Sequence, residues 1–162
     1  MEEKYKTNVS VCLLAINTDN QVLLTRRFNT GYQDGKYELP SGHIEKGETA
    51  LEGIQREAKQ ENDITIDLDS TENIGCVDNN KTGKHFNLLF KCTSFGGEAK
   101  VMEPEECDDL IWMDYYEFLS GKNAELMSTD TLRFLVMIKE AKQFMSFTGE
   151  EALIEMLKGI VK

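Results

Sequence analysis

Residues 42–64 carry most of the structural information in this chain, and they read GHIEKGETALEGIQREAKQENDI. The segment 49–62 is predicted to be a helix, because Thr49 and Glu52 have the spacing of an N-terminal capping box. The apolar face of this helix is expected to consist of Leu51, Ile54 and Ala58. A glycine-containing loop therefore leads into a capped, amphipathic helix.

Acidic and amide side chains gather on and beside this helix. Glu57, Gln60 and Glu61 stand at positions i, i+3 and i+4, so they project from one face. Glu48 precedes the helix at its positive end, where a carboxylate is favoured. Two glutamates at this spacing alone are typical of a solvated helix face, but here they also keep a set distance from Gly42. Because clustered carboxylates repel one another unless a cation neutralises them, the pattern predicts an oxygen-rich site for Mg²⁺ or Mn²⁺.

Several positions in this stretch keep a spacing that is found in one protein family. They are Gly42, Glu48, Arg56, Glu57, Ala58, Glu61 and Ile64. Their order resembles the signature of the Nudix hydrolases, which runs Gly, five residues, Glu, seven residues, then Arg-Glu-(apolar)-x-Glu-Glu-x-Gly-(apolar). The segments 37–42 and 97–112 are also similar to parts of this family, so the resemblance covers roughly residues 5–145.

Two positions depart from the signature. Gln60 stands where the family has a glutamate, which removes one negative charge and leaves an amide oxygen that holds a divalent cation less strongly. Asp63 replaces the glycine that ends the helix, and we expect it to adopt the left-handed conformation that Asn and Asp tolerate better than most residues.

The resemblance implies both a fold and an activity. The fold would be α+β, a Nudix-type α/β/α sandwich with a mixed central sheet. The activity would be hydrolysis of a pyrophosphate bond. It would depend on Mg²⁺, for which Mn²⁺ could substitute. The substrate would be a nucleoside di- or triphosphate, or a nucleoside diphosphate linked to another moiety. Bound cations offset phosphate charge and lower the pKa of bound water. A catalytically weak or inactive nucleotide-binding module of the same fold is the alternative, because Gln60 weakens the metal site.

The resemblance also implies roles for individual residues. Glu57 and Glu61 would be the principal metal ligands, with Arg56 orienting a neighbouring carboxylate by a bidentate contact. The further metal ligands would be Glu48, Gln60 and the backbone carbonyl near Gly42.

The general base and the substrate contacts are less constrained. The base is Glu57 or a carboxylate of the acidic loop, which holds Glu103, Glu105 and Glu106. We predict substrate contacts at Arg26 and Arg27, which end a strand, and at Glu105. Aromatic residues that could stack on a base are Phe28, Tyr32 and Phe86, although strand aromatics more often belong to a core.

The remainder of the chain alternates strands and helices without a regular βαβ repeat, which independently favours an α+β fold. Strands are predicted at 9–16, 21–26, 37–39, 65–68, 73–77, 85–92 and 110–113. Helices are predicted at 114–119, at 129–145, and after a capping box at 148–151, with an apolar stripe from Leu153 to Val161. We expect one domain over residues 1–147, with 148–162 as a helical extension packed on it.

Composition limits the class of protein further. The chain has 162 residues and a formal net charge of −11, which fits one acidic domain and disfavours nucleic-acid polymers as partners. Four scattered cysteines without a C-x-x-C pair predict reduced thiols rather than a zinc site. No apolar run approaches the roughly 18 residues of a membrane span. With no signal peptide visible, we expect a cytoplasmic protein, monomeric or homodimeric, that acts on a small nucleotide-type substrate.

The substrate within that class is left open by the sequence. Some Nudix groups carry a marker proline or tyrosine beyond the signature, and the segment 79–82 has neither. This disfavours the ADP-ribose and dinucleoside-polyphosphate groups.

Overall fold

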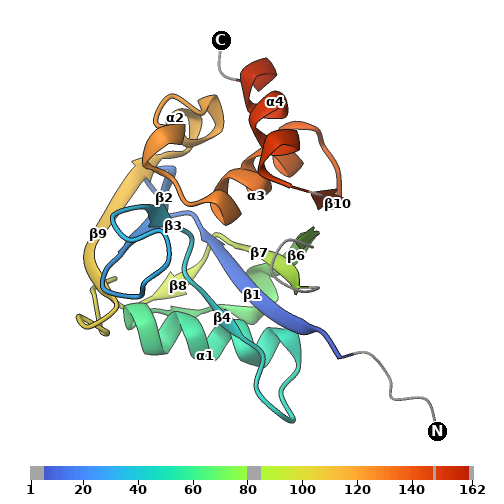
Figure 1. Cartoon of the computed structure of the whole chain (residues 1–162). Coiled ribbons are helices and arrows are strands. Elements are labelled where there is room, and N and C mark those ends of the chain that lie inside the picture. Colours follow the sequence, from blue (N-terminus) through green and yellow to red (C-terminus); the bar gives the residue numbers. More distant parts are fainter. Residues whose placement is uncertain (1–5, 80–84, 148, 161–162) are drawn as a thin grey trace, which may run out of the picture.

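The computed structural model describes residues 6–79, 85–147 and 149–160. Its helices are α1 (Ala50–Asn62), α2 (Tyr115–Ser120), α3 (Thr129–Lys139) and α4 (Glu150–Ile160), with 3₁₀ turns η1 (Leu68–Ser70) and η2 (Ala124–Leu126). Helix α1 covers one side of the sheets, and α2, α3 and α4 lie on the other side (Figure 1). The predicted α+β sandwich is therefore confirmed.

Strands of both directions build the middle layer. They are β1 (Asn8–Ala15), β2 (Gln21–Arg27), β3 (Tyr37–Glu38), β4 (Ser41–His43), β5 (Thr65–Ile66), β6 (Thr71–Asn79), β7 (His85–Cys92), β8 (Phe95–Gly96), β9 (Cys107–Asp114) and β10 (Phe144–Phe147). A five-stranded sheet has the order β10-β6-β7-β1-β4, a three-stranded sheet has the order β3-β2-β9, and β5 pairs with β8. Strand β1 runs parallel to β7 and antiparallel to β4, so the sheet is mixed as predicted.

Strand β1 is buried on both faces, which explains its continuous apolar sequence. Successive side chains of a strand point to opposite faces. Cys12 and Leu14 therefore pack in the core beneath α3, while Leu13 packs in a second core with Ile54 and Ala58 of α1. Two cores on either side of one strand hold the layers together.

Helix α1 begins and ends as its sequence predicts. The Thr49 hydroxyl accepts from Glu52 N, and the Glu52 carboxylate accepts from Thr49 N, so both halves of the capping box form. The helix ends at Asp63, whose φ of 56° and ψ of 21° are left-handed. Salt bridges from Lys59 and Lys100 hold the Asp63 carboxylate and lower its pKa to about 2. The prediction for Leu51 was wrong, because this side chain is exposed at one edge of the apolar face.

The predicted helix over 129–145 was wrong in its last part. Helix α3 ends at Lys139, and Ala141 adopts a positive φ of 51° that turns the chain. Residues 144–147 then form β10, which pairs parallel with β6. Burial in β10 alternates, with Met145 and Phe147 inside and Phe144 exposed. This period of two belongs to a strand, and it begins where the apolar run of α3 is interrupted by charged residues.

The strands that the sequence predicts agree closely with those of the structure. All seven predicted strands correspond to observed ones, although 65–68 ends early at Ile66 and continues as η1. The short strands β4 and β8 were not predicted, because two or three residues do not show a period. All four cysteines are free thiols, as expected, and Cys12 and Cys92 are buried.

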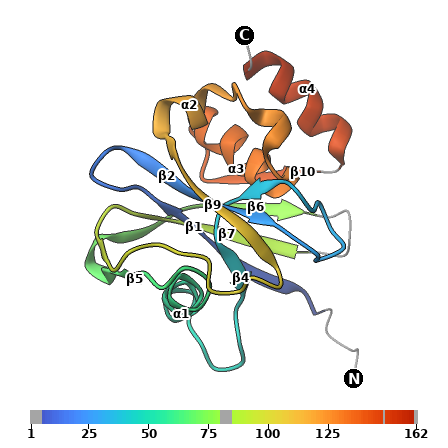
Figure 2. The same cartoon turned by 90° about the vertical axis from the view of Figure 1, so that its left-hand side faces the viewer.

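The C-terminal helix α4 packs on α3 through Leu153, which is 2% exposed (Figure 2). Thr148 of the predicted capping box and Val161 of the predicted stripe lie outside the described residues, as do residues 80–82 of the marker segment. In the described part of the chain, no helix combines the length and apolarity that crossing a membrane would need.

Candidate functional site

A cleft of about 780 Å³ opens beside α1. Side chains from β1, β4 and β7 of the larger sheet, from β2 and from the start of α3 enclose it. The predicted residues that line it are Arg26, Arg27, Tyr32, Gly42, Arg56, Glu57, Gln60, Glu61, Glu103 and Glu106. The predicted residues that do not line it are Phe28, Glu48, Phe86 and Glu105. The structure thus brings most of the signature and one loop to a single hollow.

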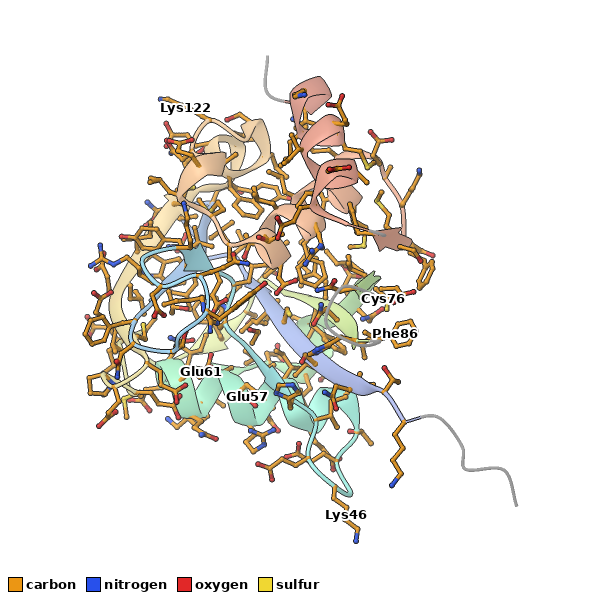
Figure 3. The ribbon with its side chains drawn as sticks, in the orientation of Figure 1. Lys46, Glu57, Glu61, Cys76, Phe86 and Lys122 are labelled. Atoms are coloured by element: carbon orange, nitrogen blue, oxygen red, sulfur yellow. The ribbon has the colours of Figure 1, made fainter. Side chains whose placement is uncertain are left out.

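The Glu57 carboxylate occupies the space that a side chain at position 42 would fill, and Gly42 leaves this space free. The two acidic residues Glu57 and Glu61 lie one turn apart on α1 (Figure 3). A Cβ atom added to Gly42 would stand 1.9 Å from Glu57 Oε1 and 2.1 Å from its Cδ. Any other residue at position 42 would therefore displace the Glu57 carboxylate from this place.

Arg56 connects the carboxylates at the mouth of the cleft. Its Nε and Nη2 donate to the two carboxylate oxygens of Glu48 at 2.6 and 3.0 Å, which is a bidentate contact. Its Nη1 donates to Glu57 Oε1 at 2.8 Å, and Nη2 also donates to the His43 carbonyl at 2.9 Å. Hydrogen bonds from Arg56 lower the pKa of Glu48, and those to Glu48 raise the pKa of Arg56. Glu57 is therefore oriented, while Glu48 faces the guanidinium rather than the cleft.

Glu61 is partly buried among other acidic groups of the cleft, one turn after the buried Glu57. Burial raises its pKa well above the ordinary value, and the nearby Glu57, Glu38 and Glu103 carboxylates add to this effect. One oxygen accepts from Ser41 N at 3.2 Å. A buried carboxylate among other carboxylates is stabilised in its charged form by a cation.

The donor set in this region fits a hard divalent cation by its chemistry. Glu57 and Glu61 offer carboxylate oxygens, and Gly42 offers a backbone carbonyl. Within the described ranges, no three His, Cys, Asp or Glu side chains are already gathered as a ligand cluster, and Arg56 occupies Glu48 and one oxygen of Glu57. A cation would therefore bind with rearrangement of these side chains.

Gln60 has a partner that the sequence did not indicate. Its Nε2 donates to Glu103 Oε1 at 2.9 Å, which ties the acidic loop to α1. A glutamate at this position could not donate, so it would repel Glu103 unless a cation lay between them. Gln60 is thereby placed beside Glu57 and Glu61, but its predicted part in metal binding stays a prediction.

Both arginines of β2 line the cleft, and each is already paired with a carboxylate. Arg26 Nε donates to Asp108 at 2.7 Å, and Arg27 Nη1 donates to Glu38 at 2.7 Å. Burial raises the pKa of Glu38 to about 7 in spite of this partner. Arg27 also donates to the Tyr32 carbonyl at 2.6 Å, and this holds the loop after β2. Their predicted contacts to substrate stay predictions.

Sequence reasoning missed the floor of the cleft. Ser10 and Asn87 lie opposite each other on β1 and β7, and both line the cleft together with His85. The available signal was a polar residue at an inward position of an otherwise apolar strand. Phe86, by contrast, alternates to the other face of β7 and lies away from Glu57 and Glu61 (Figure 3).

Comparison with known sequences gives a consistent result. The model of the NUDIX domain matches residues 6–133. The chain is 33% identical over 87 residues to an ADP-ribose pyrophosphatase of Methanocaldococcus jannaschii, covering 53% of this chain and 51% of that protein. It is 32% identical over 94 residues to a MutT-like protein of Streptomyces ambofaciens, covering 58% and 56%. The chain thus spans about half the length of the curated relatives it matches.

Solved structures show the same fold. A MutT NUDIX hydrolase from Burkholderia pseudomallei superposes with a TM-score of 0.66 at 21% identity, covering 81% of this chain and 97% of that one. The NUDIX domain of Shewanella oneidensis NrtR, solved with ADP ribose, superposes with a TM-score of 0.67 at 15% identity, covering 85% and 89%. At such identities the likeness concerns the fold alone.

Proposed function

The chain belongs to the NUDIX domain family, and on that premise we propose that it hydrolyses a pyrophosphate bond in a nucleotide derivative. The substrate would be a nucleoside di- or triphosphate, or a nucleoside diphosphate linked to another moiety. The observation that carries the proposal is the placement of Glu57 and Glu61 side by side in the cleft, with Glu57 seated on Gly42.

The cation would be Mg²⁺, for which Mn²⁺ could substitute. It would be held by Glu57, Glu61, Glu48, Gln60 and the Gly42 carbonyl. When bound, such a cation neutralises phosphate oxygens and lowers the pKa of water. The chain itself contributes orientation. Arg56 fixes the Glu57 carboxylate through its 2.8 Å contact. Glu61 lies near the Glu57, Glu38 and Glu103 carboxylates, and a bound cation would offset the repulsion among them.

The general base is proposed to be one of the carboxylates that reach the cleft. Glu57 lies at the site, and Glu103 lies next to α1 through Gln60. Glu106 also lines the cleft, whereas Glu105 is exposed outside it, so Glu105 is the weakest candidate for a base or for a substrate contact. A carboxylate must come within hydrogen-bond reach of the attacking water to serve as base.

The remaining features of the proposal concern the whole protein. The acidic chain would act on small nucleotide-type molecules rather than on nucleic-acid polymers, in the cytoplasm, as a monomer or homodimer. Residues 1–147 would form the catalytic domain and 148–162 an extension packed on it. Size-exclusion chromatography of the full chain and of a variant lacking 148–162 tests whether the extension holds a dimer together.

A nucleotide panel tests the function. Nucleoside triphosphates, ADP-ribose and dinucleoside polyphosphates are incubated with the protein and Mg²⁺ or Mn²⁺, and phosphate-containing products are measured. We expect hydrolysis of at least one compound, and we expect Glu57→Gln and Glu61→Gln to abolish it while the melting temperature is retained. Unchanged rates in both variants would overturn the site assignment. If no compound is cleaved while one raises the melting temperature, the protein is a nucleotide-binding module instead.

A further inference from the structure

The chain has two histidines, and the fold brings their side chains together at the wall of the cleft. His43 lies on β4 and His85 on β7, with β1 between these two strands in the sheet. On β1, Ser10 pairs with His43 and Asn8 pairs with His85. Because residues two apart on a strand share a face, the two imidazole rings lie over the same face of β1. Their ring centroids are 5.3 Å apart.

This separation fits two rings that bind one tetrahedral metal ion. An imidazole nitrogen binds Zn²⁺ at about 2.0–2.1 Å, and the ring centre lies about 1.1 Å behind that nitrogen, so each centre is about 3.2 Å from the metal. At the tetrahedral angle of about 109°, two such ring centres are about 5.2 Å apart. The observed 5.3 Å agrees with this value, and the ring planes are tilted by 42° rather than stacked.

The ring of His85 is oriented by a buried hydroxyl. Its Nε2 lies 2.7 Å from the Oγ atom of Ser10, which is 6% exposed. Metal-binding histidines use one ring nitrogen for the metal and the other for a hydrogen bond that fixes the ring, so Nδ1 of His85 is the nitrogen suited to a metal. Burial and the neighbouring His43 lower the pKa of His85, which favours the neutral ring that metals bind.

The histidine pair is separate from the carboxylates of α1. A Cβ atom at Gly42 would meet the Glu57 carboxylate, so position 42 of β4 faces α1. Because successive residues of a strand point to opposite faces, His43 points away from α1. The two sets also differ in chemistry, since carboxylate oxygens suit Mg²⁺ whereas imidazole nitrogens suit Zn²⁺.

We propose that His43 and His85 form a second metal site, which binds Zn²⁺ and is distinct from the carboxylate site of the proposed hydrolase. Within the described residues, no three His, Cys, Asp or Glu side chains are gathered to hold a metal, so this site has two protein ligands. The other positions of a tetrahedral ion are then open to water or to a ligand in the cleft. The ion would join the edge strand β4 to β7 across β1, and binding to the folded chain alone would raise its thermal stability.

A zinc titration of the full chain tests the site. The protein carries no histidine tag and is freed of metal with a chelator, and excess Mg²⁺ is present throughout to occupy the carboxylates. Because each of the two histidines gives one Hε1 resonance, NMR follows both rings separately while calorimetry measures the affinity. The variants are His43→Ala and His85→Ala, and Cys107→Ser is the matched control because this thiol also lines the cleft. Thermal unfolding is recorded for every protein.

We expect Zn²⁺ to shift both wild-type resonances with the same concentration dependence and to raise the melting temperature. Each histidine variant should bind Zn²⁺ at least about tenfold more weakly, and Cys107→Ser should bind it as the wild type does. If a histidine variant does not fold, the two wild-type resonances still decide the outcome.

Resonances that Zn²⁺ leaves in place, or an unchanged affinity in folded histidine variants, would overturn the inference. Loss of binding in Cys107→Ser would also overturn it, because the metal would then lie on sulfur. None of these results depends on whether the protein hydrolyses a nucleotide, so the zinc site and the hydrolase can fail independently.

Discussion

Replacing Gly42 by alanine tests the geometry of the site most directly. The added Cβ would stand 1.9 Å from Glu57 Oε1, whereas ordinary contacts begin at about 3.4 Å, so the carboxylate must move by about 1.5 Å. The atoms it meets are the end of a flexible side chain, not backbone, and the fold can accommodate the change by rotation of Glu57. This rotation breaks the 2.8 Å contact from Arg56 to Glu57.

The expected effect is large on catalysis and small on stability. A displacement of about 1 Å in a catalytic group can lower the rate about 100-fold, so we expect Gly42→Ala to lose at least that much in kcat/KM. The free energy of unfolding should fall by about 1–2 kcal/mol, the size of one partly buried polar contact. Hydrolysis of the best panel substrate and urea unfolding measure the two quantities.

Gly53→Ala is the matched control. A Cβ at Gly53 meets Glu48 Oε2 at 3.5 Å and Val11 at 3.7 Å, which are ordinary contacts. Because Gly53 lies inside α1, alanine should stabilise the protein by up to about 1 kcal/mol and leave the rate unchanged. A folded Gly42→Ala protein with the wild-type rate would refute the inference that this glycine positions Glu57.

Three further predictions concern charge and packing. Gln60→Glu should raise the affinity for Mn²⁺ in a calorimetric titration, because it adds a carboxylate beside Glu61; an unchanged affinity would place residue 60 outside the ligand set. The raised pKa of Glu38 means that the unfolded chain loses this proton first, so the free energy of unfolding should fall by up to about 3 kcal/mol between pH 4.5 and about 7 and then level off. Urea unfolding of Glu38→Gln should lack that part of the pH dependence, and an identical profile would contradict the assignment. Leu153→Ala should lower the free energy of unfolding by about 3 kcal/mol, because this side chain joins α4 to the core; a loss below about 1 kcal/mol would show that α4 is not an integral part of the fold.

Local signals in the sequence predicted the elements that local forces stabilise. Thr49 and Glu52 are three residues apart, and they close the capping box of α1 without help from the remainder of the chain. Asp63 adopts the left-handed conformation that ends the helix, which aspartate tolerates better than most residues. The family signature then placed Glu57 and Glu61 on one face of that helix.

The misassigned segments depended on distant partners. Residues 144–147 are a strand because β6 offers them a free edge, and β6 lies some seventy residues earlier in the chain. Leu51 matches the helical period, but the sheet covers only part of the helix circumference. Neither the free edge of β6 nor the width of the sheet can be predicted from the residues next to these segments in the chain.

The sequence by itself determined the family, the helix that carries the carboxylates, and the need for a cation to neutralise them, because each follows from residue types at short, fixed spacings. Only the tertiary structure decided what faces those carboxylates. In the folded chain, the Glu57 carboxylate lies against Gly42, and Arg56 donates to Glu48. Arg26 donates to Asp108, and Arg27 donates to Glu38. The fold also places Asn87 in the cleft floor. These contacts join strands and loops that are far apart in the chain, and such pairs are determined by how the two cores pack rather than by the order of neighbouring residues.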